Sequence, residues 1–379
     1  MKRICLDISP LATIEKSGIG FYIENLIDNI LEFDKVNQYL LFGFSPIQRI
    51  SYLKNLYSSH KNLIRRNKII PLPSKLSYRF YYHWQRLNFP YIENFIGDKI
   101  DVYHNFEWYM PPARNVKTIA TVYDITTKKF PELHKKKNVE LQNLRLSRLY
   151  KTNRIVAISE TTRNDIVDYY NYPKEKIDVI YPGANPIFKP ACKEDVDRIL
   201  NKYSLSSSFI LSVGTLEPRK NIARLIQAYI SLTGSINEDL VIVGQIGWGD
   251  ASELSISNSI NSKIKFLNYV PTEDLAILYS SCSYFVYIPL YEGFGIPVIE
   301  SMGVGKPFLA SDIDSLKEVS GNFGYKANPL DVSDIANKLQ IMSGSVLHNV
   351  VDQNAIERSK LFNYKDSAIK MIEVYNILD

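Results

Sequence analysis

Two glutamates that bracket a glycine turn are the most chemically suggestive feature of the sequence. Glu292 precedes Gly293-Phe294-Gly295, and Glu300 follows eight residues after Glu292. Glycines let a backbone pass close to a ligand with its N–H groups turned outward, and a helix beginning near Ile296 would point its positive end at a phosphate. Because charge is costly in a core, we expect the two carboxylates to reach different parts of one elongated ligand. The alternative is a buried corner whose glycines only permit tight packing.

A pair of cations indicates where an anion could bind. Arg219 and Lys220 lie between the apolar run 209–214 and an amphipathic helical pattern, at a predicted strand-to-helix junction. Positive charge at a helix start opposes the helix dipole, and this cost favours an anion-binding role over a solvated pair. Arginine offers a fork and lysine a point charge, which together suit a pyrophosphate.

Two features of the N-terminal half could line a ligand site. Asp124 ends the apolar run 117–123, and ligands bind at the carboxyl edge of open α/β sheets. Alternatively, Asp124 caps the next turn. Gly18 and Gly20 belong to a Gly-Ile-Gly loop between a predicted strand and helix, without the third glycine of a dinucleotide fingerprint. The loop is therefore either one wall of a phosphate-facing cleft or a turn that only docks the helix.

The elements that must position these residues follow from the apolar pattern. Strand-like runs alternate with amphipathic stretches, which is typical of doubly wound α/β domains with mainly parallel sheets. We expect a helix over 21–33, and residues 313–379 are predicted to be helical with short breaks. The expected strands are 3–9, 39–44, 68–72, 101–105, 117–123, 154–159, 178–181, 209–214, 240–244, 264–270, 284–289 and 308–310.

A proline-rich segment predicts the domain boundary. Residues 181–190 contain three prolines and a glycine between two periodic regions. We expect an N-terminal domain over residues 1–185, a C-terminal domain over 186–362, and a terminal helix over 363–379.

Composition excludes several classes of protein. A chain of 379 residues with 45% hydrophobic residues is long enough for two cores and too apolar to be disordered. Three scattered cysteines indicate reduced thiols without a disulfide framework or a metal site. Because no run of eighteen apolar residues occurs, we expect neither a membrane span nor a signal peptide, and a cytoplasmic location.

The net charge of +5 is unevenly distributed. Residues 1–190 hold 29 Lys+Arg against 18 Asp+Glu, whereas residues 191–379 hold 16 against 22. The segments 75–95 and 128–154 mix cations with aromatic rings, which suits an anionic membrane surface or a pyrophosphate-bearing acceptor. A solvated helix face over a tyrosine-rich core is the alternative. No recognition motif for nucleic acid accompanies the charge.

Two of these motifs resemble those of a known family. The pattern Glu-Gly-Phe-Gly-(x)4-Glu resembles the donor-binding motif of family 4 glycosyltransferases, which are retaining enzymes of the GT-B fold. Gly-Thr-Leu-Glu-Pro-Arg-Lys-Asn at 214–221 is similar to the family's diphosphate-binding segment, whose Pro-Arg-Lys version is common among mannosyl- and rhamnosyl-type members. The resemblance covers nearly the whole chain. It departs from the family at Tyr123, where a histidine usually precedes the aspartate, so a histidine contact to the donor is not expected.

The resemblance implies a fold and roles for individual residues. The fold would be α/β, with two facing Rossmann-like domains and an interdomain cleft. Glu292 would orient the donor sugar, Glu300 would bind the ribose, and the backbone at Val270 would lie beside the base. Arg219 and Lys220 would stabilise the leaving diphosphate, so no metal or other cofactor is expected. The residues expected to bind the donor are Gly18, Gly20, Gly214, Arg219, Lys220, Val270, Glu292, Gly293, Phe294, Gly295, Ile296 and Glu300; those expected in catalysis are Asp124, Arg219, Lys220 and Glu292.

The predicted function is that of a retaining, metal-independent hexosyltransferase. It would move mannose, preferably from GDP-mannose, to a polyprenyl-diphosphate-linked glycan in surface polysaccharide assembly of the O-antigen or capsule type. A UDP- or dTDP-sugar donor, a GT-B nucleotide-sugar epimerase and a non-catalytic polysaccharide-binding protein are the alternatives. The expected location is cytoplasmic, with peripheral contact at the inner face of an anionic membrane and no nucleic-acid partner.

Overall fold

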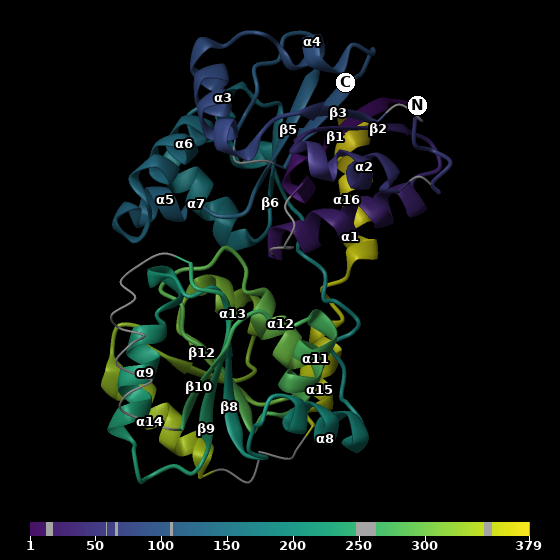
Figure 1. Ribbon diagram of the computed structural model, residues 1–379. Helices are drawn as coiled ribbons and strands as arrows, with labels where there is room; N and C mark the ends of the chain where they lie inside the picture. The colour runs from purple at the N-terminus through teal and green to yellow at the C-terminus, as the bar shows by residue number, and fades with distance from the viewer. Residues whose placement is uncertain are drawn as a thin grey trace. The chain divides into compact units, whose positions relative to one another are not determined.

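The computed structural model describes residues 1–12, 18–57, 59–64, 67–106, 109–247, 263–344 and 351–378. The chain divides into two compact units (Figure 1). The first unit comprises Met1–Gly183 together with Asn363–Asp379, and the second comprises Ala184–Phe362. The boundary at Gly183 lies two residues before the one expected from the proline-rich segment.

The first unit is built on a seven-stranded sheet in the order β3-β2-β1-β4-β5-β6-β7. Every pairing in it is parallel. The interior of β1 is fully buried, as in parallel sheets with helices on both faces. The strands are β1 Arg3–Asp7, β2 Gln38–Ser45, β3 Lys68–Pro71, β4 Val102–Asn105, β5 Lys117–Val122, β6 Arg154–Ala157 and β7 Ile177–Val179.

The first helix of this unit, α1, begins earlier than the sequence predicted. α1 begins at Gly18, so Gly18 and Gly20 lie in its first turn and not in a loop; Ser17 lies outside the described residues. The buried face of α1 continues from the stripe Ile23–Leu31 back to Tyr22 and Gly20, so packing includes the first turn. The helices are α1 Gly18–Phe33, α2 Ile47–Asn55, α3 Ser74–Leu87, α4 Ile92–Ile96, α5 Thr126–Lys129, α6 Lys136–Leu146, α7 Glu160–Tyr170 and α16 Tyr364–Ile377.

The C-terminal helix α16 belongs to the first unit. It packs against α1, as the adjacent yellow and purple helices in Figure 1 show. Its Tyr375 hydroxyl lies 2.7 Å from Nδ1 of His104 in β4, and Nε2 of this histidine lies 2.8 Å from the hydroxyl of Thr121 in β5. Burial lowers the pKa of His104 to about 3. The neutral ring therefore joins the terminal helix to two strands.

The second unit is built on a six-stranded sheet in the order β10-β9-β8-β11-β12-β13, again with parallel pairings. The strands are β8 Phe209–Val213, β9 Asp239–Val243, β10 Ile264–Leu267, β11 Tyr284–Tyr287, β12 Phe308–Ser311 and β13 Tyr325–Ala327. The helices are α8 Lys193–Lys202, α9 Ile222–Ser231, α11 Thr272–Ser281, α12 Ile296–Gly303, α13 Asp314–Ser320, α14 Val332–Ser343 and α15 Gln353–Ser359.

The expectation that residues 313–379 are helical was wrong at β13. This strand has three residues, Tyr325–Ala327, and pairs only with β12 among the described strands. A strand so short gives no period-2 pattern in the sequence. The prediction of two Rossmann-like α/β domains is confirmed, since each unit holds a parallel sheet with intervening helices. In the described part of the chain, no helix is both long and apolar enough to cross a membrane.

Candidate functional site

The loops that follow β8 and β11 meet at the switch point of the second sheet. The strand order reverses between these two neighbours, and ligands of doubly wound sheets bind at the carboxyl ends of the strands at such a point. The backbone N–H of Leu290, after β11, donates to the carbonyl oxygen of Arg219, after β8, over 2.8 Å. The two loops are thus fixed to each other by backbone as well as by side chains.

Three donors converge on one carboxylate oxygen. Oε1 of Glu292 accepts hydrogen bonds from Nη1 of Arg219 at 2.6 Å and Nζ of Lys220 at 2.5 Å. It also accepts one from the hydroxyl of Tyr287 at 2.7 Å. Nη2 of Arg219 donates to Oε1 of Glu217 at 2.6 Å. The structure therefore brings together Arg219, Lys220 and Glu292, which the sequence analysis proposed separately as an anion receptor and a sugar ligand.

A tight turn aims the two cations at this carboxylate. Pro218–Lys220 form a single 3-10 turn, and Asn221 takes the left-handed conformation with φ 61° before α9 begins. Asparagine tolerates this conformation better than most residues, and its Nδ2 is held by the carbonyl oxygen of Pro329 at 2.7 Å. Arg219 and Lys220 thus lie just before α9 and turn back toward the end of β11.

The charges of this cluster set its protonation. Burial raises the pKa of the Glu292 carboxyl, but the charges of Arg219 and Lys220 and the hydrogen bonds outweigh burial and lower this pKa to about 2. Burial lowers the pKa of Lys220, against the opposing effect of Glu292. Burial and Glu292 raise the pKa of the Tyr287 phenol well above its usual value. At neutral pH, Glu292 is ionised and Tyr287 is a neutral donor.

The glycine turn leads directly into α12. Gly295 caps this helix with φ 103°, and a Cβ built there would lie 2.3 Å from Cδ2 of Leu316. Helix α12 starts at Ile296, where the first N–H groups of a helix lack intrahelical partners. The side chain of Phe294 is buried against the ring of Phe362, with centroids 5.4 Å apart. A ligand at Gly293–Gly295 would therefore meet backbone and not this ring.

Glu300 lies one helical turn inside α12 and differs from Glu292 in protonation. Burial raises the pKa of the Glu300 carboxyl to about 7, and the phenol of Tyr279 in α11 offsets part of this effect. Near neutral pH, Glu292 is therefore ionised and Glu300 only partly so, because Glu292 is paired with Arg219 and Lys220, whereas burial dominates at Glu300.

Gly214 and Val270 lie at the same edge of the second sheet. Gly214 follows β8. A Cβ built on Gly214 would lie 3.6 Å from the aliphatic stem of Lys220. A Cβ built on Gly244, which follows β9, would lie 2.0 Å from the carbonyl oxygen of Gly214. The two loops therefore pass too close to each other for a larger residue at position 244. Val270 is buried between β10 and α11. Its loop follows the carboxyl end of β10.

The remaining candidates, Asp124, Gly18 and Gly20, belong to the first unit. Oδ1 of Asp124 accepts the backbone N–H of Thr126 at 2.9 Å, so the aspartate caps the turn after β5, the alternative role given above. It still lies at the carboxyl edge of the first sheet. Tyr123, in the position of the family's histidine, is buried and donates its hydroxyl to the carbonyl oxygen of Phe106 at 3.1 Å. Tyr123 is thereby held within the first unit.

Two members of the cluster were not predicted from the sequence. Glu217 stands inside the quoted diphosphate segment but received no role, and Tyr287 was read only as a strand residue. The signal for Tyr287 was its place at the last position of β11, immediately before the loop that carries Glu292. A second unpredicted acid, Asp7 at the end of β1, is buried and accepts hydrogen bonds from the hydroxyls of Tyr103 and Tyr109 at 2.5 and 2.8 Å. Burial raises the pKa of Asp7.

Comparison with known sequences assigns both halves of the chain. The family described as Glycosyltransferase Family 4 matches residues 48–187, and the one described as Glycosyl transferases group 1 matches residues 196–358. The chain is thus a glycosyltransferase with one domain of each kind. The prediction of a glycosyltransferase is thereby confirmed, and its partners are a nucleotide-sugar donor and a glycan acceptor.

Two curated relatives and one solved structure show how far the similarity extends. The chain is 29% identical to O-antigen chain mannosyltransferase B of Escherichia coli over 377 residues, 96% of each protein. It is 29% identical to the serotype-specific mannosyltransferase WbdA of Escherichia coli over 284 residues, which cover 70% of this chain and 34% of WbdA. The crystal structure of Anabaena Alr3699/HepE with UDP and glucose matches 99% of this chain and 100% of its own at a TM-score of 0.71 and 15% identity. Its likeness, with that of other glycosyltransferase structures, confirms the GT-B fold.

The described residues contain no group of three or more His, Cys, Asp or Glu side chains placed to hold a metal ion. The charged groups at the switch point are instead two cations and two carboxylates, Arg219 and Lys220 with Glu217 and Glu292.

Proposed function

We propose that this glycosyltransferase is a retaining mannosyltransferase that uses GDP-mannose and extends a glycan in O-antigen-type polysaccharide assembly. The support for mannose is the similarity to two mannosyltransferases, one of which matches along nearly its whole length. The support for the site is the single observation that Arg219 and Lys220 converge on Glu292 at the switch point of the second sheet.

The cluster suits a donor that carries a diphosphate beside a sugar. The diphosphate would take hydrogen bonds from Arg219 and Lys220, and the sugar hydroxyls would donate to Glu292. All three hydrogen bonds to Glu292 within the described chain end on Oε1, so Oε2 is the oxygen left to a sugar. The backbone at Gly293–Gly295 and the start of α12 would face phosphate, and Glu300 in its ionised form would accept the ribose hydroxyls.

The cations would lower the barrier by stabilising the leaving group. As the bond between C1 of mannose and the diphosphate oxygen breaks, negative charge grows on the diphosphate, where Arg219 and Lys220 are already in place. The acceptor hydroxyl would attack C1 from the face that the diphosphate leaves, which retains the configuration. Its proton would pass to the departing phosphate oxygen. We propose that this chemistry needs no metal ion, because the cation pair performs the metal's usual task.

The first unit is proposed to bind the acceptor. Asp124, at the carboxyl edge of its sheet, is the candidate for contact with the acceptor hydroxyl. The acceptor would be a glycan linked to polyprenyl diphosphate, and the basic N-terminal half, with 29 Lys+Arg against 18 Asp+Glu over residues 1–190, suits its diphosphate and an anionic membrane surface. The enzyme would then work in the cytoplasm, peripherally at the inner face of the membrane.

A donor panel tests this proposal. GDP-mannose, GDP-deoxyhexoses and UDP- and dTDP-sugars are each incubated with enzyme and acceptor extract, with and without EDTA, and nucleotide release is followed. Release from GDP-mannose alone supports the proposal, and loss of release in EDTA overturns its metal independence. Release from a UDP- or dTDP-sugar instead would show that the proposed donor, GDP-mannose, is wrong. A new nucleotide-sugar formed without acceptor would identify an epimerase.

Matched variants connect the activity to the site. Glu292→Gln and Lys220→Met remove one charge each, and the methionine keeps the aliphatic stem beside Gly214. Lys317→Met is the control, because Lys317 forms an exposed ion pair with Asp312 at 2.7 Å in the same unit. Both site variants should lose release, while the control keeps it. If the site variants remain as active as the control, the cluster is not the donor site.

A further inference from the structure

A basic cavity of about 260 Å³ lies in the first unit, away from the residues assigned so far. It is formed by the segment after α3, the segment before β5 and the turn before β6. Thr118, near the start of β5, lines it, whereas Asp124 follows the opposite end of the same strand. Six residues of extended chain separate them by roughly 20 Å. The cavity therefore lies at the amino edge of the first sheet and is distinct from the proposed acceptor-binding edge.

The lining of this cavity is positively charged. Three of its ten lining residues are basic, namely Arg114, Arg148 and Lys151, and no acidic residue is among those described as lining it. Arg114 and Lys151 are exposed, and the guanidinium of Arg114 lies over the ring of Tyr91, 5.9 Å from its centroid. Near the cavity, Oε1 of Glu93 accepts hydrogen bonds from the backbone N–H groups of Arg114 and Asn115. This oxygen is thus bonded to the backbone of the loop that carries Arg114.

Arg148 is the buried member of this set, with only 8% of its surface exposed. Its Nη2 donates to Oδ1 of Asn88 at 2.5 Å. Its Nη1 is buried and finds no hydrogen-bond partner among the described residues. Burial lowers the pKa of Arg148, and among the described residues no acidic group offsets this effect. A buried guanidinium without a counter-charge is costly, and an arginine stays charged at neutral pH even so.

We propose that this cavity binds a phosphate group, with Arg148 as its buried anchor and Arg114 and Lys151 at its mouth. A phosphate oxygen would accept the hydrogen bond that Nη1 of Arg148 does not make, and the guanidinium fork suits a tetrahedral oxyanion. The site is separate from the diphosphate-binding pair Arg219 and Lys220, which belong to the second unit.

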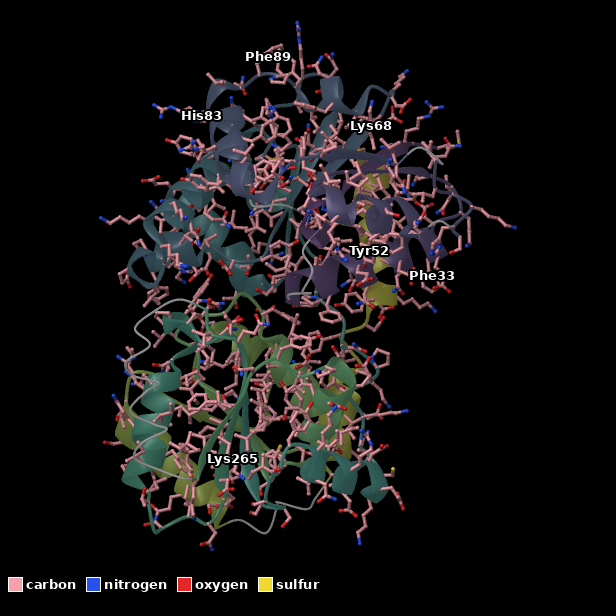
Figure 2. The ribbon with its side chains drawn as sticks, in the orientation of Figure 1. Phe33, Tyr52, Lys68, His83, Phe89 and Lys265 are labelled. Carbon is pink, nitrogen blue, oxygen red and sulfur yellow. The ribbon has the colours of Figure 1, made fainter. Side chains whose placement is uncertain are left out.

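The surroundings favour a phosphate carried by a membrane phospholipid over a soluble one. Leu87 and Phe89, on either side of Asn88, are 72% and 63% exposed, and Tyr150, beside Lys151, is 56% exposed. Phe89 points away from the ribbon of the first unit in Figure 2. Apolar and aromatic side chains next to a basic cavity suit the headgroup zone of an anionic bilayer. This step gives a specific site to the membrane contact proposed above.

Two binding assays test the site and identify the source of the phosphate. In one, inorganic phosphate and glycerol phosphate are titrated into the full-length protein by calorimetry. In the other, the protein is sedimented with phosphatidylcholine vesicles with and without phosphatidylglycerol. Sedimentation only with the anionic vesicles identifies a lipid headgroup. A binding heat with inorganic phosphate or glycerol phosphate, without vesicle binding, would identify the ligand as a soluble phosphate compound. Both outcomes support the site if the variants below abolish them.

The variants separate the cavity from general charge. Arg148→Gln keeps much of the side-chain volume and should weaken binding about tenfold or more, since a hydrogen bond to a charged group is worth roughly 1.5–3 kcal/mol. Arg114→Ala and Lys151→Ala remove exposed charges and should each weaken it severalfold without risk to folding. Lys54→Ala removes an exposed lysine of α2 in the same unit, outside the segments 75–95 and 128–154, and should leave binding unchanged. Leu87→Ser with Phe89→Ser should weaken vesicle binding alone.

Two results would overturn the proposal. One is the absence of binding in both assays; the other is an equal loss of binding in Lys54→Ala and in the rim variants. Neither assay contains a sugar donor, and nucleotide release from the donor in the presence of a soluble acceptor should be unchanged in Lys151→Ala. Failure of this site therefore leaves the transferase proposal standing, and failure of the donor panel leaves this site standing.

Discussion

Nζ of Lys220 lies 2.5 Å from Oε1 of Glu292, although the two residues are 72 positions apart in the sequence. Arg219 reaches the same oxygen at 2.6 Å. The pair joins the loop after β8 to the loop after β11, which places a cation and a carboxylate at the one point of the second sheet where the strand order reverses. The ion pair thus links the fold of this unit to its proposed chemistry.

The first prediction concerns the charge of Glu292. Glu292→Gln should lower kcat/KM by about 100-fold or more, the size of effect seen when a preorganised polar group is removed from a reacting site. Glu217→Gln should cost less, because the carboxylate of Glu217 is paired with Arg219 and is not proposed to contact the sugar. Kinetics with saturating acceptor measure both variants. Equal losses in the two variants would contradict a direct contact between Glu292 and the sugar.

The residues of this site differ in how well the sequence predicts them. Arg219, Lys220 and Glu292 were identified from residue type and local context, since glycines, cations and acids at strand ends signal ligand binding in a linear motif. Their mutual contact was not, because the pairing of β8 with β11 is a long-range feature that no local pattern encodes. Tyr287 was missed for the same reason: a tyrosine in a buried strand looks like core until its hydroxyl is seen at Glu292.

The first unit shows a second limit. The glycine pattern at Gly18 and Gly20 predicted a loop, but the apolar stripe of α1 extends the helix through both residues. Packing of this stripe against the core outweighs the low helix propensity of glycine, which costs about 1 kcal/mol per residue. The strands of both sheets were predicted within a few residues, apart from β13, because each is an apolar run bounded by turns.

A pH-dependent stability is expected from Glu300. Its pKa rises from 4.5 to about 7 on folding, because burial disfavours the charged form. Between these values the folded state holds a proton that the unfolded state has lost, so stability falls as the pH rises through this window and then levels off. Compared with the wild type, Glu300→Gln should be more stable at pH 8 by up to about 3 kcal/mol and similar at pH 4.5. Urea unfolding at both pH values measures the difference. An equal effect of the substitution at the two pH values would contradict the raised pKa.

His104 should behave in the opposite way. Its pKa falls from 6.5 to about 3 because burial disfavours the imidazolium. The unfolded state therefore binds a proton that the folded state does not, and this contribution to stability is lost as the pH falls from about 6.5 toward 3. In NMR spectra, the His104 ring signal should not titrate between pH 5 and 8.

The bond from His104 to α16 gives a matched variant. Tyr375→Phe removes one hydroxyl and leaves Nδ1 of His104 without that partner, which should lower the free energy of unfolding by about 1–3 kcal/mol. Tyr169→Phe is the control, because Tyr169 is exposed in α7 of the same unit. If both variants cost the same, the histidine bridge does not hold the terminal helix.

The last prediction concerns Gly295, which connects the glycine turn to α12. Gly295→Ala should lower the free energy of unfolding by about 1–3 kcal/mol, because φ 103° strains any residue with a Cβ. A second cost comes from Leu316, whose Cδ2 would lie 2.3 Å from the new methyl group. The double variant with Leu316→Ala separates the two costs, since it removes the clash and leaves the strain. In a double-mutant cycle by urea unfolding, the pair should cost less than the sum of the single variants. Strict additivity would mean that the backbone conformation alone requires glycine at this position.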